Sequence, residues 1–519
     1  MTPRRQEDYT TVKDAFAAAK HFIMRLPGLA TVFLKNSIIG YLFEAKSLKD
    51  AVIYTKYWIL IWASILKFVV KLIFKRGPVG AFRVIRHYPW LLRFFSTTTL
   101  LRRLTRGRKG AYLESTALII GSIAVTLVEK LEEVVYQPEI LLINEDLVPP
   151  EIGMAMGLNV WLVEAMGILL PLIHSDASEN YIDEAENAGM NPDSCSFVKA
   201  AVGMIIKNQQ PIGCAIVSSN MPCDAGMASY TYIQKAYDVP IYRVDAPYNF
   251  HGERAETLFV EDLKGMIAFL EEHTPGRMDW DKLRKICRGR NRMMELELEL
   301  WDMMRASPAP LAAEAVWLSH LWHFYMFPGH KEAIRVFERL VELARKNLDA
   351  NIPAVENEKY RAVLWNPPFP QFPDIFNMVE RAHGITLIMD SMSYNHHNPI
   401  DTSTPETMLR GLAQIIMHGP MVRHTRGPAE NYLDDIFRCY KQFDLDMVWI
   451  ANHVGCKGGQ AMNGILREKC REMKIPLLIL DYDLVDPRIV SHEGMLRQVD
   501  DFMETVMKAR RPAAAPAPQ

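Results

Sequence analysis

Three cysteines stand where the chain could bring sulfur ligands together. Cys195 lies in GMNPDSCSFVKA, Cys223 in SSNMPCDAG and Cys456 in ANHVGCKGG. A thiolate is a ligand for metal ions and iron–sulfur clusters, and neighbouring glycines let backbone N–H groups approach the sulfur. Gaps of 28 and 233 residues match no compact ligand motif. Spacing alone therefore leaves two interpretations open, a shared metal site or unrelated buried cysteines.

The elements that would position these cysteines follow from short apolar runs. Cys223 comes after the predicted strand PIGCAIVSS, and Cys456 comes after DMVWIA. Cys195 follows an acidic loop at the start of a helical run. Two of the three thus occupy the same place in two lobes, where strand ends that face one crevice could bring them together.

Strands alternate with helices along most of the chain, which is typical of parallel sheets. We expect strands at 140–144, 211–219 and 239–247, and again at 360–368, 384–391, 446–453 and 475–483. The predicted fold class is α/β, with two doubly wound parallel-sheet, flavodoxin-like lobes. The predicted divisions are a basic, apolar helical extension (1–110), a first lobe (111–265), a helical segment (266–354), a second lobe (355–508) and a disordered tail (509–519).

Composition indicates a folded protein in a reducing compartment. Of 519 residues, 49% are hydrophobic and 23% are charged, which excludes a disordered chain. Seven cysteines are an odd, widely spaced set, and the N-terminal residues show no secretory signal. We therefore expect a cytoplasmic protein whose cysteines are buried, ligating or nucleophilic, and we expect no nucleic-acid partner.

Charge is distributed unevenly along the chain. Residues 51–110 contain 13 Lys and Arg and no Asp or Glu. On a helix over 51–76, apolar and aromatic residues occupy most of the surface, and one stripe contains four lysines: Lys56, Lys67, Lys71 and Lys75. This pattern is typical of a helix at a lipid surface, here the inner membrane surface. Two alternatives stay open, burial against this protein or a partner subunit, and a spanning helix.

Several separated motifs together resemble the 2-hydroxyacyl-CoA dehydratase/benzoyl-CoA reductase family. They occur in order over roughly 140–510 and are PPEIGMAMG, DSCSFVKA, PCD, YDVPIYRVDAPY, NMVERAHGI and HVGCK. The resemblance implies two α/β lobes and one [4Fe–4S] cluster held by Cys195, Cys223 and Cys456. It also implies a fourth iron position open to water or a substrate oxygen. Residues 1–110 are not explained by it.

The resemblance further implies one-electron chemistry on an acyl-CoA thioester through a ketyl radical, leading to dehydration or ring reduction. The electron would come from a separate ATP-dependent iron–sulfur activator protein, because this chain contains no Walker A motif. A homologous second subunit would complete a heterodimer. The alternative function is an accessory electron-transfer or structural cluster-bearing subunit without a substrate pocket of its own.

Two further residues are candidates for a catalytic role. Glu151 in PPEIGMAMG matches a family position near the cluster and would hydrogen-bond a cluster-bound water or move a proton. Its alternative is a helix N-terminal glutamate after two prolines. His453 would donate to a sulfur or to the thioester, and its alternative is loop packing. Cys214, Cys287, Cys439 and Cys470 are interpreted as packing residues.

Overall fold

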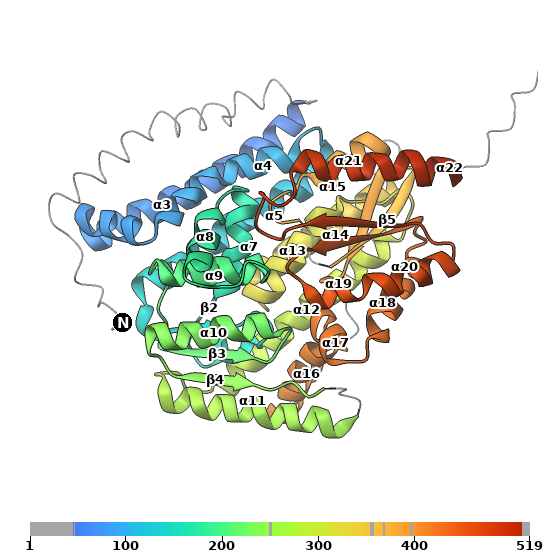
Figure 1. The fold of residues 1–519 in the computed structure, drawn as a ribbon. Coiled ribbons are helices and arrows are strands. Elements are labelled where there is room, and N and C mark those ends of the chain that lie inside the picture. Colours follow the sequence, from blue (N-terminus) through green and yellow to red (C-terminus); the bar gives the residue numbers. More distant parts are fainter. Residues whose placement is uncertain are drawn as a thin grey trace, which may run out of the picture.

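The computed structural model describes residues 45, 47–248, 252–352, 358–366, 369–394 and 398–510. Residues 1–44 and 46 of the expected helical extension lie outside these ranges, as do residues 511–519 of the expected tail. Two parallel four-stranded sheets with helices around them confirm the predicted fold class (Figure 1). Their strands are largely buried, because helices cover both faces of each sheet.

The first sheet has the strand order β2-β1-β3-β4, all parallel. Its strands are β1 (Leu141–Asn144), β2 (Asn159–Leu162), β3 (Ala215–Ser219) and β4 (Ile241–Val244). The helices that accompany it are α6 (Pro150–Ala155), α7 (Val163–Ile173), α8 (Glu179–Asn187), α9 (Ser196–Ile206), α10 (Asp224–Tyr237) and α11 (Glu253–His273).

The second sheet repeats this arrangement with the order β6-β5-β7-β8, also all parallel. Its strands are β5 (Tyr360–Trp365), β6 (Ile385–Asp390), β7 (Met447–His453) and β8 (Leu477–Tyr482). The accompanying helices are α15 (Ile375–His383), α16 (Pro405–His418), α17 (Pro420–Arg426), α18 (Glu430–Gln442), α19 (Lys457–Ala461), α20 (Asn463–Glu472), α21 (His492–Phe502) and α22 (Lys508–Arg510), with the π-helical turn η3 (Met503–Met507) before α22.

Helices also precede and separate the lobes. The chain before β1 forms α3 (Leu48–His87), the 3₁₀ helix η1 (Pro89–Ser96), α4 (Thr97–Thr105), α5 (Gly110–Tyr136) and η2 (Pro138–Ile140). The intermediate segment forms α12 (Trp280–Met304), α13 (Ala313–Met326) and α14 (Lys331–Asp349). Buried side chains from all these parts form one contiguous hydrophobic core. The N-terminal helices that the structure describes are therefore packed into the body of the protein (Figure 1).

The order in which the chain adds strands reverses at the equivalent point in both sheets. In the first, the chain crosses from β2 back over β1 to β3, and in the second it crosses from β6 back over β5 to β7. Open α/β sheets bind ligands outside the carboxyl ends of strands at such a switch point. We therefore expect a ligand site at the loops after β1 and β3 and at the loops after β5 and β7.

One strand was not expected from the sequence. β2 is a four-residue edge strand that passes directly into α7, so NVWL and VEAMGILLPLI form one apolar run without a turn residue. A short apolar run of this kind does not distinguish strand from buried helix. The other strands lie inside the predicted runs, and most are a few residues shorter.

Candidate metal centre

Each of the three candidate cysteines immediately precedes a helix. Cys195 is the N-cap residue of α9, Cys223 of α10 and Cys456 of α19. Cys223 and Cys456 follow the equivalent strands β3 and β7, as the sequence predicted. Backbone N–H groups at a helix start point toward the preceding residue and favour negative charge there. This position stabilises the thiolate form that ligates metals.

A direct contact joins the two lobes at Cys195. Its Sγ lies 3.1 Å from Nε2 of His453, the last residue of β7. The Nδ1 atom of the same ring accepts a hydrogen bond from the Leu484 backbone N–H at 3.1 Å. Burial lowers the pKa of His453, so the ring is neutral and its single proton is on Nε2. His453 therefore donates to the sulfur of Cys195.

Glycine permits this close approach. A Cβ atom on Gly455 would lie 2.7 Å from Cα of Cys195, and one on Gly459 would lie 3.3 Å from Sγ of Cys456. Across the same junction Lys457 donates to Asp193 at 2.6 Å, so this lysine pairs with a carboxylate. The loops before α9 and after β7 are thus packed against each other.

The three thiols also interact electrostatically. Burial raises the pKa of Cys195 to about 12, while N–H groups of α9 lower it and the charges of Cys223 and Cys456 raise it further. Burial likewise raises the pKa of Cys223, and the charge of Cys456 adds to that effect. The charges of Cys223 and Cys456 thus act on Cys195 although the three residues belong to segments far apart in sequence. A bound metal would have to displace their protons.

The other four cysteines lie elsewhere. Cys214 precedes β3 while Cys223 follows it, so the two lie beyond opposite ends of that strand. The remaining three are buried on helices: Cys287, Cys439 and Cys470. Within the described ranges, no group of three or more His, Cys, Asp or Glu is arranged to hold a single metal ion. A cubane cluster binds each cysteine to a different iron atom, so its ligands need not converge on one point.

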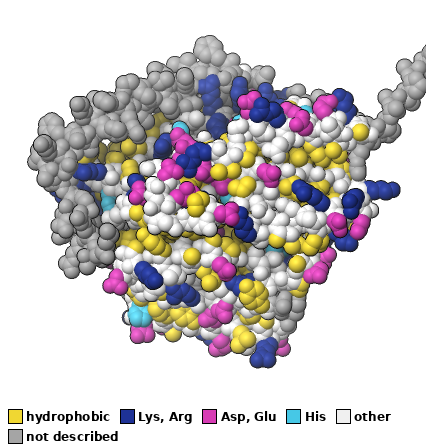
Figure 2. Space-filling view, viewed as in Figure 1, with side chains coloured by type: hydrophobic (Ala, Val, Ile, Leu, Met, Phe, Trp, Pro, Cys, Tyr) yellow, Lys and Arg dark blue, Asp and Glu magenta, His cyan; other side chains and the backbone are white. Residues whose placement is uncertain are grey.

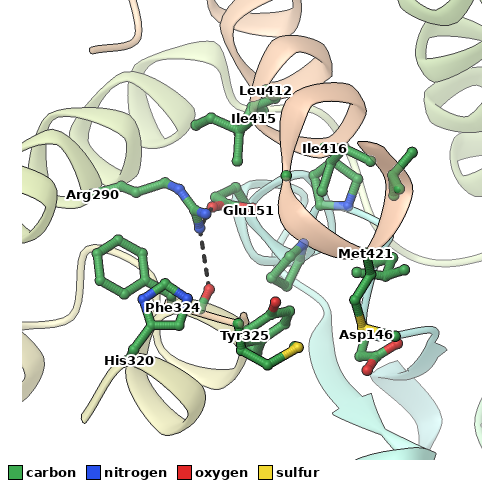
Figure 3. A pocket seen from close by; sticks show the side chains of 16 residues that line it. Asp146, Glu151, Arg290, His320, Phe324, Tyr325, Leu412, Ile415, Ile416 and Met421 are labelled. Carbon is green, nitrogen blue, oxygen red and sulfur yellow. Dashed lines mark hydrogen bonds and ion pairs between the residues drawn. The ribbon is translucent and has the colours of Figure 1, made fainter. Parts of the chain in front are cut away.

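A cavity of about 50 Å³ lies beside the end of β1 and contains Glu151 in its wall (Figure 3). That volume is room for a few water molecules. Glu151 is the second residue of α6, is buried, and pairs with Arg290 at 2.5 Å. Arg290 also donates to the Phe324 carbonyl at 3.1 Å. Glu151 is therefore a buried ion-pair partner, a role that the sequence did not indicate.

An imidazole that no sequence pattern indicated also lines this cavity. His320 on α13 stacks on Phe324, and its Nδ1 lies 2.6 Å from the buried Glu297 carboxylate of α12. A histidine oriented by a carboxylate is a common acid–base arrangement. Nothing local distinguishes this histidine, because it stands in the apolar helix AEAVWLSHLWHFYM.

Three carboxyl groups gather at the strand ends of the first lobe. Glu145 and Asp146 follow β1, and Glu164 follows β2. Burial raises the pKa of each, to about 8 for Glu145. Tyr230 donates to Glu164 at 2.8 Å. Asp146 lines the cavity, and the charge of Glu145 acts on Cys223.

Glu145→Gln is expected to flatten the pH dependence of stability. The backbone N–H and hydroxyl of Ser219 contact this carboxyl group, and an amide preserves the shape of its protonated form. Because the folded pKa of about 8 exceeds the usual value near 4.3, the protonated group stabilises the fold fully below about pH 4. That contribution is lost as the pH rises through 8.

Near pH 8 we expect the free energy of unfolding of Glu145→Gln to exceed that of the parent by roughly 2 to 4 kcal/mol. Urea unfolding at about pH 5 and about pH 8 measures it. The matched control is Glu139→Gln, an exposed glutamate just before β1, which should not alter the slope. Equal slopes in the parent and Glu145→Gln would contradict the assignment.

The described residues thus form two α/β lobes, with Cys195, Cys223 and Cys456 at helix starts and a cavity beside the end of β1. A family model described as 2-hydroxyglutaryl-CoA dehydratase, D-component, matches residues 147–506. The chain belongs to this family, and the resemblance noted from its motifs is confirmed. The matched range includes all three cysteines of the junction.

Named relatives agree with this membership. A benzoyl-CoA reductase subunit from Thauera aromatica is 22% identical over 367 residues, covering 65% of this chain and 82% of the relative. The (R)-phenyllactyl-CoA dehydratase alpha subunit of Clostridium sporogenes is 21% identical over 70% of this chain and 89% of its own length. The alpha subunit of (R)-2-hydroxyglutaryl-CoA dehydratase from Acidaminococcus fermentans is 25% identical over 33% of this chain and 37% of its own length.

Proposed function

We propose that this chain is the [4Fe–4S] subunit of a dehydratase or reductase that acts on an acyl-CoA thioester. The observation that supports this most is that Cys195, Cys223 and Cys456 each stand at a helix N-terminus and interact electrostatically across distant segments. Three soft sulfur ligands with nearby backbone N–H donors suit an iron–sulfur cluster. When bound, such a cluster supplies one low-potential electron and one iron atom with an open position.

The protein's own residues would position and protect this chemistry. His453 donates to Cys195, and we assign it as a positioning residue for that ligand. Glu151, with Arg290, forms a buried polar wall of the cavity beside which the acyl end of the thioester would bind. The His320–Glu297 pair and Asp146 provide groups that hold or accept protons in the same cavity.

The cavity favours an enzyme over an accessory subunit. An electron-transfer or structural subunit needs no polar pocket beside its cluster ligands, whereas Asp146 in the cavity wall directly follows Glu145, whose charge acts on Cys223. Relatives named as subunits support a homologous second subunit as partner. We further propose an ATP-dependent iron–sulfur activator as electron source and a cytoplasmic location.

Iron and acid-labile sulfide analysis of the anaerobically purified chain tests the cluster directly. We expect about four of each per chain. The reduced protein should show the electron paramagnetic resonance signal of a [4Fe–4S]⁺ cluster. A chain that contains no iron after anaerobic reconstitution would contradict the proposal.

His453→Leu is expected to loosen the cluster and lower its potential. The leucine removes the N–H that donates to Cys195, and loss of such a supporting contact typically costs about 10- to 100-fold in metal affinity. Fewer hydrogen bonds to sulfur leave more negative charge on it, so the midpoint potential should become more negative. Chelator competition and redox titration measure the two effects.

His453→Gln provides the matched comparison, because its amide can still donate to the sulfur. It should retain the cluster better than leucine does. Equal losses in both variants would show that His453 acts only through packing.

A further inference from the structure

One side of α3 is part of the core and the other side is not. Its inward face packs along α5 through a row of buried side chains: Tyr54, Tyr57, Ile61, Ile65, Phe68 and Leu72. Its outward face exposes large apolar side chains over the same length, among them Leu48 at 83% and Phe74 at 86% exposed. Figure 1 shows the helix along the outer edge of the fold, beside α4 and α5.

The exposed apolar residues form a continuous stripe. At about 100° per residue they fall within a sector about 100° wide, and at about 1.5 Å per residue they extend over about 40 Å. They are Leu48, Val52, Ile59, Leu66, Val70, Ile73 and Phe74. Exposed apolar strips of this size mark a surface that another body covers.

The exposed charged side chains that α3 itself contributes beside this stripe are basic, and Glu129 of α5 acts on one of them, Lys67. Helix α3 contains eight Lys and Arg residues and one acidic residue, Asp50, which is buried and accepts from the Ser47 hydroxyl and the Gly110 N–H. On the same angular scale, one edge of the stripe is lined by three exposed lysines: Lys49, Lys56 and Lys67. Half-buried Trp58 and Trp62 contact each other near the opposite edge.

This combination matches an anionic lipid surface better than it matches a protein. On the face of the molecule in Figure 2, basic and acidic side chains are interspersed among apolar ones, as on an ordinary protein surface. The outward side of α3 instead combines apolar and aromatic residues with lysine alone. Interfacial helices have this composition, because acyl chains accept the apolar stripe and anionic headgroups attract the lysines.

The packing of α3 also decides how it would meet a bilayer. By length and composition both α3 and α5 could cross a membrane. Within the protein, however, 83% of the most apolar stretch of α5 is buried, against 28% of the corresponding stretch of α3. Because α3 is attached to α5 along one side, crossing would carry the folded body and the lysines into the hydrocarbon. An orientation parallel to the surface exposes the lysines to headgroups instead.

We propose that α3 lies flat on an anionic membrane surface and holds this protein there through its outward stripe. The apolar side chains would enter the headgroup boundary, and Lys49, Lys56 and Lys67 would pair with lipid phosphates. This inference does not depend on the proposed chemistry, since the stripe and the cysteine junction share no residue.

Flotation of the full-length protein with vesicles tests it. We expect binding to phosphatidylcholine vesicles that contain phosphatidylglycerol, much weaker binding to phosphatidylcholine alone, and release at high salt. The double variant Leu66→Glu/Phe74→Glu should bind about tenfold more weakly, as should Lys56→Glu/Lys67→Glu. All four positions are exposed, so both variants should melt at the parent's temperature.

The matched control is Leu258→Glu/Leu298→Glu, two exposed leucines on α11 and α12 that should leave binding unchanged. Vesicle binding that survives both α3 variants would overturn the proposal. The proposal would also be overturned if the parent protein did not bind vesicles and the α3 variants failed to associate with a partner subunit. The stripe would then be a protein interface.

Discussion

Replacing Cys223 with alanine is expected to lower the iron and sulfide content of the anaerobically purified chain from the proposed four atoms of each, about one cluster, to near none. The same result is expected for Cys195→Ala and Cys456→Ala. Each sulfur would come from a different segment and from the start of a different helix. Elemental analysis together with the visible absorption of the cluster measures the loss.

Cys214→Ala is the matched control for these variants. Cys214 precedes β3, at the opposite end of that strand from the loop that contains Cys223, and is half-buried. It should keep its full iron content. Equal iron loss in Cys214→Ala, or full retention in any of the three junction variants, would contradict the assigned ligand set.

Arg108→Leu is expected to destabilise the fold by about 3 to 5 kcal/mol, a typical cost of breaking a buried ion pair. Arg108 is buried between Glu314 of α13 at 2.5 Å and Glu380 of α15 at 3.0 Å. Burial raises the pKa of Glu380 to about 8, and Arg108 opposes that effect. Leucine therefore leaves two buried carboxyl groups without their cation.

The pH dependence of this penalty identifies its cause. Without Arg108 the pKa of Glu380 rises further, so the folded state holds its protons more tightly and loses more stability as the pH increases. The penalty should be larger near pH 8 than near pH 5 in urea unfolding. Arg106→Leu, at an exposed position two residues earlier, should cost little. Similar unfolding midpoints for the two variants would refute a role for the buried pairs.

The sequence was sufficient for the features that depend on local pattern. Apolar runs located seven of the eight strands that the structure describes, and the rule that parallel strands present ligands at their carboxyl ends placed Cys223 and Cys456 correctly relative to β3 and β7. β2 was missed, because no turn residue separates it from α7. Local propensity contains no information on such a boundary.

Contacts between distant segments could not be predicted in the same way. The bond between Cys195 and His453 joins residues 258 positions apart, and the His320–Glu297 pair meets across two helices. Glu151 was recognised from its motif, but its partner Arg290 was not, because an arginine in the charged helix WDKLRKICRGRNRMM has no distinguishing neighbours. These pairings depend on how the lobes and the helical segment pack.

The proposal as a whole is tested most directly by the electron paramagnetic resonance spectrum of the reduced protein, recorded with its partner subunit before and after addition of an acyl-CoA thioester. We expect a cluster signal that depends on Cys195, Cys223 and Cys456 and changes when the thioester binds. A cluster signal that the thioester leaves unchanged would contradict a substrate site in this chain and would favour an accessory electron-transfer subunit.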